Sequence, residues 1–294
     1  MRTLLCRLPT DCETALHSVV QRRDPQWTQT GFPPRLWQHL PSPDPFFAAV
    51  LSQIELPPDS RPARALCQAL IATPLFLRYL ASPANFSRAE LAVVCRALML
   101  VDPGLDARFA SALPGDSCAL QDVAATLHVL PVLDELSSGS RLVMALTRLT
   151  RSPSSKVASK AALMLGRRVS NPLWAERQMS VDDPRLRANV IQSLWGLDSA
   201  TARKCLRASL HDPNNRVVAN ALVGLHLIGD PDVAARLKAM VTHPDPRFRA
   251  SAAWALGQIG DRSLENTLRL ALEDSEAAVR ASAARALEAF RAEA

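Results

Sequence analysis

The side chains with the most regular spacing for chemistry in this sequence are cations. Arg207, Lys238 and Arg269 follow one another at equal intervals, and Arg203 and Lys204 stand just before the first of them. Guanidinium and ammonium groups that line up in space can bind the carboxylates of an acidic protein or the phosphates of a nucleic acid. These five residues are therefore the candidate partner-binding residues.

Two observations limit what this cation series can bind. Each cation is expected near the C-terminus of a helix, where the helix dipole alone favours a positive charge by roughly 0.3 to 1 kcal/mol, so a structural role is the competing interpretation. Glu265 and Glu273 interrupt the series near Arg269, which favours a protein partner over a long nucleic acid. The expected partner is a protein with an acidic surface, and nucleic acid is the alternative.

A second series of arginines is expected to be structural. It consists of Arg187, Arg249 and Arg280, and the interval between the first two is twice the interval between the last two. We predict that they pair with aspartates of the turns and so set the stacking of successive repeats. The aspartates considered for this role are Asp183, Asp212 and Asp245.

No grouping of residues predicts catalysis. The sequence has no Gly-rich phosphate loop, no Gly-x-Ser-x-Gly motif and no spaced Cys/His cluster. Trp174, Trp195 and Trp254 could stack on a nucleobase, but Trp195 and Trp254 lie in apolar helical patterns and are predicted to pack in the core. His211 and His243 are interpreted as helix-end residues, not metal ligands. We expect no catalytic residue, no cofactor and no metal.

An internal repeat carries these residues. Its first apolar positions recur at nearly equal intervals along the sequence, and leucine stands eight positions after each of them. Apolar residues recur within a repeat at helical spacing and stop at turns such as Gly229-Asp230-Pro231. Each repeat is thus predicted to be a helical hairpin, and stacked hairpins bury apolar faces that one hairpin alone cannot. The first apolar positions are Val157, Leu186, Val217, Phe248 and Val279.

Acidic residues mark the predicted starts of the helices. A carboxylate there can accept from the exposed amides of the first turn, and a proline after it has its backbone already set for a helix. Asp230 is the predicted cap of a second helix. Leu206, Leu237 and Leu268 form the predicted apolar spine of the second helices. The predicted caps of the first helices are Asp183, Asp212, Asp245 and Asp274.

The segment Asp245-Pro-Arg-Phe-Arg-Ala-Ser-Ala-Ala-Trp-Ala-Leu-Gly-Gln-Ile-Gly-Asp261 resembles the HEAT-like repeat of the phycobilin-lyase type. The resemblance extends over residues 150–294, about four and a half repeats. It implies an all-α fold, a right-handed α-solenoid of helical hairpins in which the second helices line the concave face. The five candidate cations would then form a basic stripe on that face. Repeats of this kind serve lyase subunits, hydroxylases, DNA-repair proteins and scaffolds, but the His-Glu pairs of the hydroxylases are absent from this sequence.

Residues 1–149 show helical runs without a clear period. They are expected to form degenerate helical hairpins that cap the solenoid of residues 150–294. Prolines at 33–34, 41–45 and 57–58 break the beginning of this region. The expected helical runs are about 11–22, 44–56, 62–80, 87–101, 118–136 and 139–151.

Charge and composition narrow the classes of protein further. Residues 1–150 carry 13 basic and 13 acidic side chains, whereas residues 151–294 carry 21 and 15, and the excess is concentrated in residues 151–216 with 12 and 5. Six cysteines without a Cys-x-x-Cys pair make a disulfide framework improbable. No run of about 20 apolar residues predicts a membrane helix, and no signal sequence is recognisable, so the expectation is a soluble, cytoplasmic protein.

The leading functional hypothesis is a non-catalytic interaction or scaffold protein that binds a partner protein through its concave face. A nucleic-acid-binding, repair-type protein that uses the basic second half is the first alternative. A lyase-like or chaperone-like subunit acting on another protein is the second.

Overall fold

The computed structural model describes residues 74–113, 120–136 and 139–292, together with residues 47, 48, 51 and 71. Within these residues all regular structure is helical, which confirms the predicted all-α fold. No helix among them is both long and apolar enough to cross a membrane. The chain divides into two compact units, Met1–Ala145 and Leu146–Ala294. The capping role of residues 1–149 stays a prediction, and the expected runs at 11–22 and 44–56 lie almost wholly outside the described residues.

The described part of the first unit is helical and has a leucine-rich core. Leu80, Leu91, Leu98 and Leu130 are fully buried, and a capping box formed by Ser87 and Glu90 starts the second of its described helices. One of these helices, Leu105–Ala112, was not predicted. The helices are α7 (Pro74–Ala81), α8 (Arg88–Met99), α9 (Leu105–Ala112), α10 (Leu120–Leu136) and α11 (Ser140–Leu149), the last of which crosses the boundary between the units.

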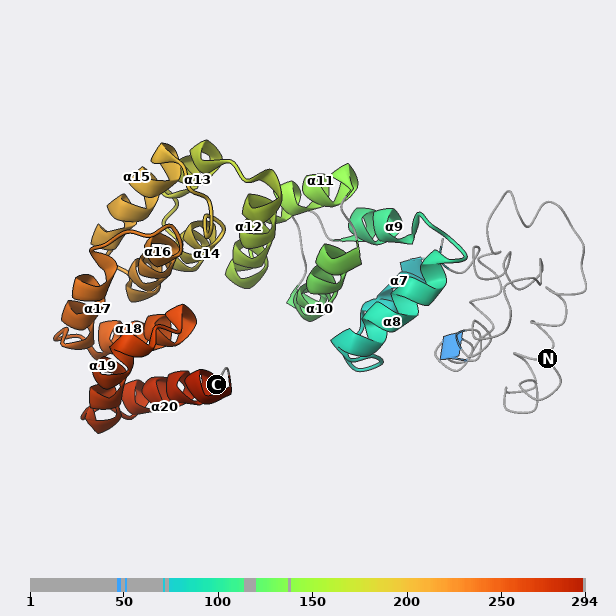
Figure 1. Ribbon diagram of the computed structural model, residues 1–294. Coiled ribbons are helices and arrows are strands. Elements are labelled where there is room, and N and C mark those ends of the chain that lie inside the picture. The colour runs from blue at the N-terminus through green and yellow to red at the C-terminus, as the bar shows by residue number, and fades with distance from the viewer. Residues whose placement is uncertain are drawn as a thin grey trace, which may run out of the picture. The chain divides into compact units, whose positions relative to one another are not determined.

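The second unit is an α-solenoid of helical hairpins (Figure 1). The first helices of the hairpins are α12 (Ser155–Val169), α14 (Pro184–Gln192), α16 (Asn215–Leu227), α18 (Pro246–Ile259) and α20 (Ala277–Ala292). The second helices are α13 (Pro172–Gln178), α15 (Ala200–Ala208), α17 (Val233–Val241) and α19 (Glu265–Leu270), and short 3₁₀ turns extend or precede some of them.

The caps of the first helices follow the sequence only in part. Asp183 accepts from the amide of Arg185 at 2.8 Å and caps α14, as predicted. Asp245 caps α18 in the same way through the amide of Arg247, also at 2.8 Å. In both helices proline follows the cap and fits the first helical position.

The predicted caps Asp212 and Asp274 are wrong. Asn214 caps α16, and the Asp212 carboxylate accepts from the Asn214 amide at 2.8 Å. Asp274 accepts from the amide of Glu276, just before α20, at 2.9 Å. Asp212 stands two residues before the cap Asn214, and Asp274 stands three residues before the first residue of α20. Each carboxylate also accepts from an arginine of the preceding repeat.

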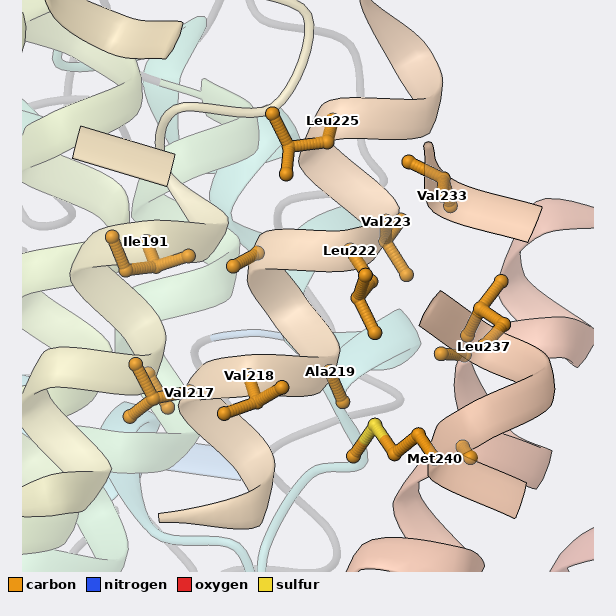
Figure 2. Close-up of a cluster of buried hydrophobic side chains, with 14 of the residues drawn as sticks. Ile191, Val217, Val218, Ala219, Leu222, Val223, Leu225, Val233, Leu237 and Met240 are labelled. Carbon is orange, nitrogen blue, oxygen red and sulfur yellow. The ribbon is translucent and has the colours of Figure 1, made fainter. Parts of the chain in front are cut away.

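The core of the second unit is one continuous cluster that runs through the hairpins (Figure 2). Ile191 and Leu222 from first helices and Leu237 and Met240 from a second helix all belong to this cluster. Each is at most 6 % exposed. The predicted spine is confirmed, because Leu206, Leu237 and Leu268 are all fully buried.

The first helices lie on the inner side of the curved stack, and the second helices lie on the outer side (Figure 1). The prediction that the second helices line the concave face is therefore wrong. The physical reason is packing distance: helices on the inside of a curve must approach more closely than helices outside it. The first helices carry the small residues that permit this, including the fully buried Ala188 and Ala219 and the contact of Gly257 with Ala286.

Candidate interaction surface

The five predicted partner-binding cations lie on the outer side, on α15, α17 and α19. Lys204 pairs with Glu176 at 3.0 Å. Arg269 pairs with Glu265 one helical turn away, at 2.6 Å. Exposed pairs of this kind stabilise a fold by roughly 0 to 1 kcal/mol, but they neutralise charge locally. Of the five cations, Lys238 alone has no carboxylate partner within the described part of the chain.

Arg203 and Arg207 hold the turn that joins α16 to α17. Arg203 donates to Asp198 at 2.8 Å and to the carbonyl oxygen of Ile228 at 2.8 Å. Arg207 donates through two nitrogens to Asp230, at 2.9 and 2.7 Å, and the Asp230 side chain is only 3 % exposed. Burial raises the pKa of Asp230, but the hydrogen bonds from Arg207 and from the Asp232 amide outweigh it and lower the pKa. These two arginines therefore have structural partners.

Asp230 does not cap a second helix as predicted. Asp232 occupies the position before α17 and makes no side-chain cap bond. The Asp230 carboxylate accepts from the Asp232 amide at 3.1 Å and takes the Arg207 guanidinium with its other oxygen. The residue thus links two repeats and starts the turn into α17.

The aspartate pairing predicted for the second arginine series is confirmed in part. Of the aspartates considered, Asp212 takes this role, whereas Asp183 and Asp245 cap helices. Arg187 donates to both carboxylate oxygens of Asp212 at 2.8 and 3.0 Å, across one repeat. Arg249 makes the same pair with Asp274 at 2.7 and 2.9 Å. Arg280 donates to the carbonyl oxygen of Asp274 at 2.7 Å. Arg187 and Arg249 thereby bind the loop that begins the next repeat, which links successive repeats, whereas Arg280 binds the loop before its own helix.

The pair formed by Arg249 and Asp274 predicts a dependence of stability on pH. The hydrogen bond from Arg249 holds the pKa of Asp274 down at about 2, below the value of about 3.9 in an unfolded chain. A depressed pKa stabilises the fold above the unfolded value, and this contribution is lost as the pH falls through the folded value. The Arg249→Met variant should therefore have a lower free energy of unfolding than wild type at pH 6. The difference should be smaller at pH 2.5, as measured by urea denaturation at both values. A difference that does not shrink would contradict the assignment.

A column of asparagine and serine residues joins the first helices on the inner side. Asn189 donates to the carbonyl oxygen of Ser159 at 2.8 Å, and Asn220 donates to that of Ala188 at 2.9 Å. Ser282 makes the equivalent contact, because its hydroxyl donates to the carbonyl oxygen of Ala250 at 2.8 Å. The column is visible in the sequence as polar residues that recur once in each repeat, and its role in joining helices could not be read from spacing alone.

The inner side is hollowed between α14, α16, α18 and α20. The hollow has a volume of about 550 Å³. Trp254 lines it with an exposed fraction of 37 %, so the prediction that Trp254 packs in the core is wrong. The Trp195 ring lies beside it, with ring centroids 6.4 Å apart, and its Nε1 donates to the carbonyl oxygen of Asn220 at 2.8 Å. Trp195 is held in place, while Trp254 presents apolar surface to the hollow.

Three arginines line the hollow together with Trp254. Arg216 and Arg285 are exposed and have no carboxylate partner among the described residues. Arg247 pairs with Asp245 at 2.6 Å, yet its side chain is 79 % exposed. Glu276 is the one acidic residue in the lining. The inner side thus combines positive charge with an exposed aromatic ring, a combination enriched at binding surfaces.

The sequence contained a signal for this surface that was missed. Arg185, Arg216 and Arg247 each stand one position before the first apolar residue of a repeat, in three successive repeats.

Within the described residues, no group of three or more His, Cys, Asp and Glu side chains could hold a metal ion. His243, considered as a metal ligand and set aside, stacks on Phe248 and accepts from the Asp245 amide through Nδ1.

Two of the cysteines can be placed. Cys95 and Cys205 are buried and unpaired. Burial raises the pKa of Cys95 to about 12 and that of Cys205 to about 11, so both thiols stay protonated and pack as small apolar groups. The other four, Cys6, Cys12, Cys67 and Cys118, lie outside the described residues.

Comparison with known proteins assigns the repeats of the second unit. The family model described as HEAT repeats matches residues 172–245 and 233–294. No curated protein matches the chain. A solved structure, human deoxyhypusine hydroxylase in complex with glycerol, is similar at 16% identity and a TM-score of 0.35, over 85% of this chain and 97% of that chain, and a likeness at this level supports no conclusion about function. Residues 172–294 of this chain are HEAT repeats.

Proposed function

We propose that this chain is a non-catalytic interaction module whose concave inner face binds an acidic partner protein. The observation that carries the proposal is that the exposed residues Arg216, Arg247 and Arg285 line the same hollow as Trp254. HEAT repeats form a helical scaffold, and a scaffold already folded into its binding shape loses little conformational freedom on binding.

The charge of this surface supports an acidic partner. Arg216 and Arg285 make no ion pair with the described residues, so their charges are available to a ligand. Residues 151–294 carry 21 basic and 15 acidic side chains, and this imbalance favours encounters with negatively charged molecules. Complementary charge raises the rate of association and excludes basic competitors.

The outer cations Arg203, Lys204, Arg207, Lys238 and Arg269 remain a second proposed surface. Lys204 and Lys238 are the members suited to a test, because reversing Arg203 or Arg207 would break contacts to a buried turn. Lys204 is 76 % exposed and its partner Glu176 is 44 % exposed, so reversal there should leave the fold intact. The two faces can therefore be compared with matched double reversals.

Nucleic-acid binding is the alternative that one observation favours. Residues 151–216 contain 12 basic and 5 acidic side chains, which is the composition expected of a phosphate-binding region. Binding to phosphates releases counterions and weakens steeply as salt is raised. A nuclease control and a salt series separate this alternative from a protein partner.

The experiment is affinity capture of the tagged full chain in its native host, with and without nuclease, followed by mass spectrometry. Arg216→Glu/Arg285→Glu reverses the inner face, and Lys204→Glu/Lys238→Glu is the control on the outer face. We expect acidic proteins that survive nuclease treatment, are lost with the inner variant and are retained by the outer variant. The same spectra report any covalent modification of a captured protein, which is the result a lyase-like role would give.

Other outcomes of this capture overturn the proposal. Loss with the outer variant only would transfer the binding site to the outer cations. Material that disappears with nuclease would make nucleic acid the ligand. Capture unchanged in both variants would exclude both faces.

A further inference from the structure

The hollow on the inner side has features that a flat charged surface would not need. We call the apolar part of its lining the floor, and this floor includes Trp254, which is 37 % exposed, and the small residues Ala250 and Ala278. Buried aromatic anchors in pockets dominate the energy of many interfaces. The floor is therefore suited to receive an apolar side chain and not only a charge.

Three cations line the hollow together with this floor. Arg216 and Arg247 lie in the first turns of α16 and α18, and Arg285 lies within α20. The N-terminal ends of helices also favour negative charge. Carboxylates on either side of a central apolar residue would meet these guanidinium groups, whereas Glu276 would repel a carboxylate placed next to it.

The size of the hollow favours a chain segment over a folded surface. A volume of about 550 Å³ falls within the range of roughly 300 to 1,000 Å³ for sites that enclose small ligands. A folded domain presents a convex surface of much larger area, but a few consecutive residues of an extended peptide can enter. An extended segment also presents alternate side chains to one side, so an apolar residue can point inward.

We propose that the hollow binds an extended acidic peptide segment by packing one apolar side chain on Trp254, with neighbouring carboxylates on Arg216, Arg247 and Arg285. This inference rests on the proposed function and names the form of the partner: an unfolded acidic segment, not a folded acidic surface. Trp254 fixes the position of the peptide, and the arginines select a peptide with negative charge.

The test uses the full chain and isothermal titration calorimetry. The probe is the capped peptide Glu-Asp-Glu-Phe-Glu-Asp-Glu, and the control peptide has glycine in place of phenylalanine. We expect the phenylalanine peptide to bind at least about 10-fold more tightly than the control. Trp254→Ala should weaken binding by about 30-fold, the loss of a strong anchor, while Trp254→Phe should restore most of it. Because Trp254 is partly exposed, circular dichroism can establish that both variants remain folded.

Charge variants complete the design. Arg216→Glu/Arg285→Glu should weaken binding of the phenylalanine peptide by about 10-fold or more, and Lys204→Glu/Lys238→Glu should leave it unchanged. Equal binding of the two peptides, wild-type affinity in Trp254→Ala, or no binding of either peptide overturns the inference. Binding of a twelve-residue oligothymidine that needs Trp254, without peptide binding, would assign the hollow to single-stranded nucleic acid instead.

Failure of this inference is distinguishable from failure of the proposed function. If charge-dependent capture of proteins succeeds and the peptides do not bind, the inner face binds a folded partner, and only the peptide is wrong. If capture does not depend on the inner arginines and the peptides do not bind, both proposals are wrong.

Discussion

Asp212→Ala is expected to lower the free energy of unfolding by about 3 to 5 kcal/mol, the cost of leaving a buried charge without its partner. Arg187 and Asp212 are joined by two hydrogen bonds at 2.8 and 3.0 Å. Their side chains are only 12 % and 9 % exposed. Without the carboxylate, the Arg187 guanidinium stays buried at the joint between two repeats. Urea denaturation of the full chain measures the loss.

The matched control for this variant is Lys204→Ala, which removes an exposed pair with Glu176. It should cost less than about 1 kcal/mol. The double variant Arg187→Met/Asp212→Leu should be less destabilised than Asp212→Ala, because neither charge remains. A loss below about 1 kcal/mol for Asp212→Ala would mean that this pair does not hold the repeats together.

Gly257→Val is expected to lower the free energy of unfolding by about 2 to 3 kcal/mol, through overpacking between α18 and α20. A Cβ atom at Gly257 would lie 2.6 Å from the Cβ of Ala286 and 3.0 Å from its Cα. Because the Cα belongs to the backbone, a rotation of a side chain cannot relieve the contact. The helices must separate, which loosens the inner side of the solenoid.

The control for this steric account is the same substitution in an Ala286→Gly background. Removing the Ala286 methyl group relieves the shorter contact, so Gly257→Val should cost less there than in wild type. Ala286→Gly alone costs about 1 kcal/mol through helix propensity, and the comparison is therefore made within each background. An equal cost in both backgrounds would contradict the contact with Ala286.

The repeat and its joints could be predicted from the sequence because they follow from local spacing. Leu206, Leu237 and Leu268 recur at one position and are fully buried. The pair of Arg187 with Asp212 could be anticipated because an arginine recurs at this position in three repeats and an aspartate recurs in the turns between them. Spacing does not decide which of two nearby polar residues caps a helix, so Asn214 was missed in favour of Asp212.

The binding surface was harder to predict because it depends on the direction of curvature. Hairpin periodicity is the same whether first or second helices lie inside, and the expectation taken from the resemblance chose the wrong helices. The small residues Gly257 and Ala286 of the first helices could have indicated the inner side from the sequence, since small residues permit the closer approach found there. The position equivalent to Trp254 is polar in two repeats, as Gln192 and Arg285, but apolar and buried in two others, as Leu163 and Val223, so this column alone did not indicate a surface.

The most direct test of the central claim is photo-crosslinking within the native host. Benzoylphenylalanine is placed at position 278 on the inner face, where exposed Ala278 lines the hollow, or at position 238 on the outer face, each in an otherwise wild-type chain. Irradiation should give a covalent adduct with an acidic protein from position 278 and none from position 238. An adduct from position 238 alone would contradict the claim that the concave inner face is the binding surface.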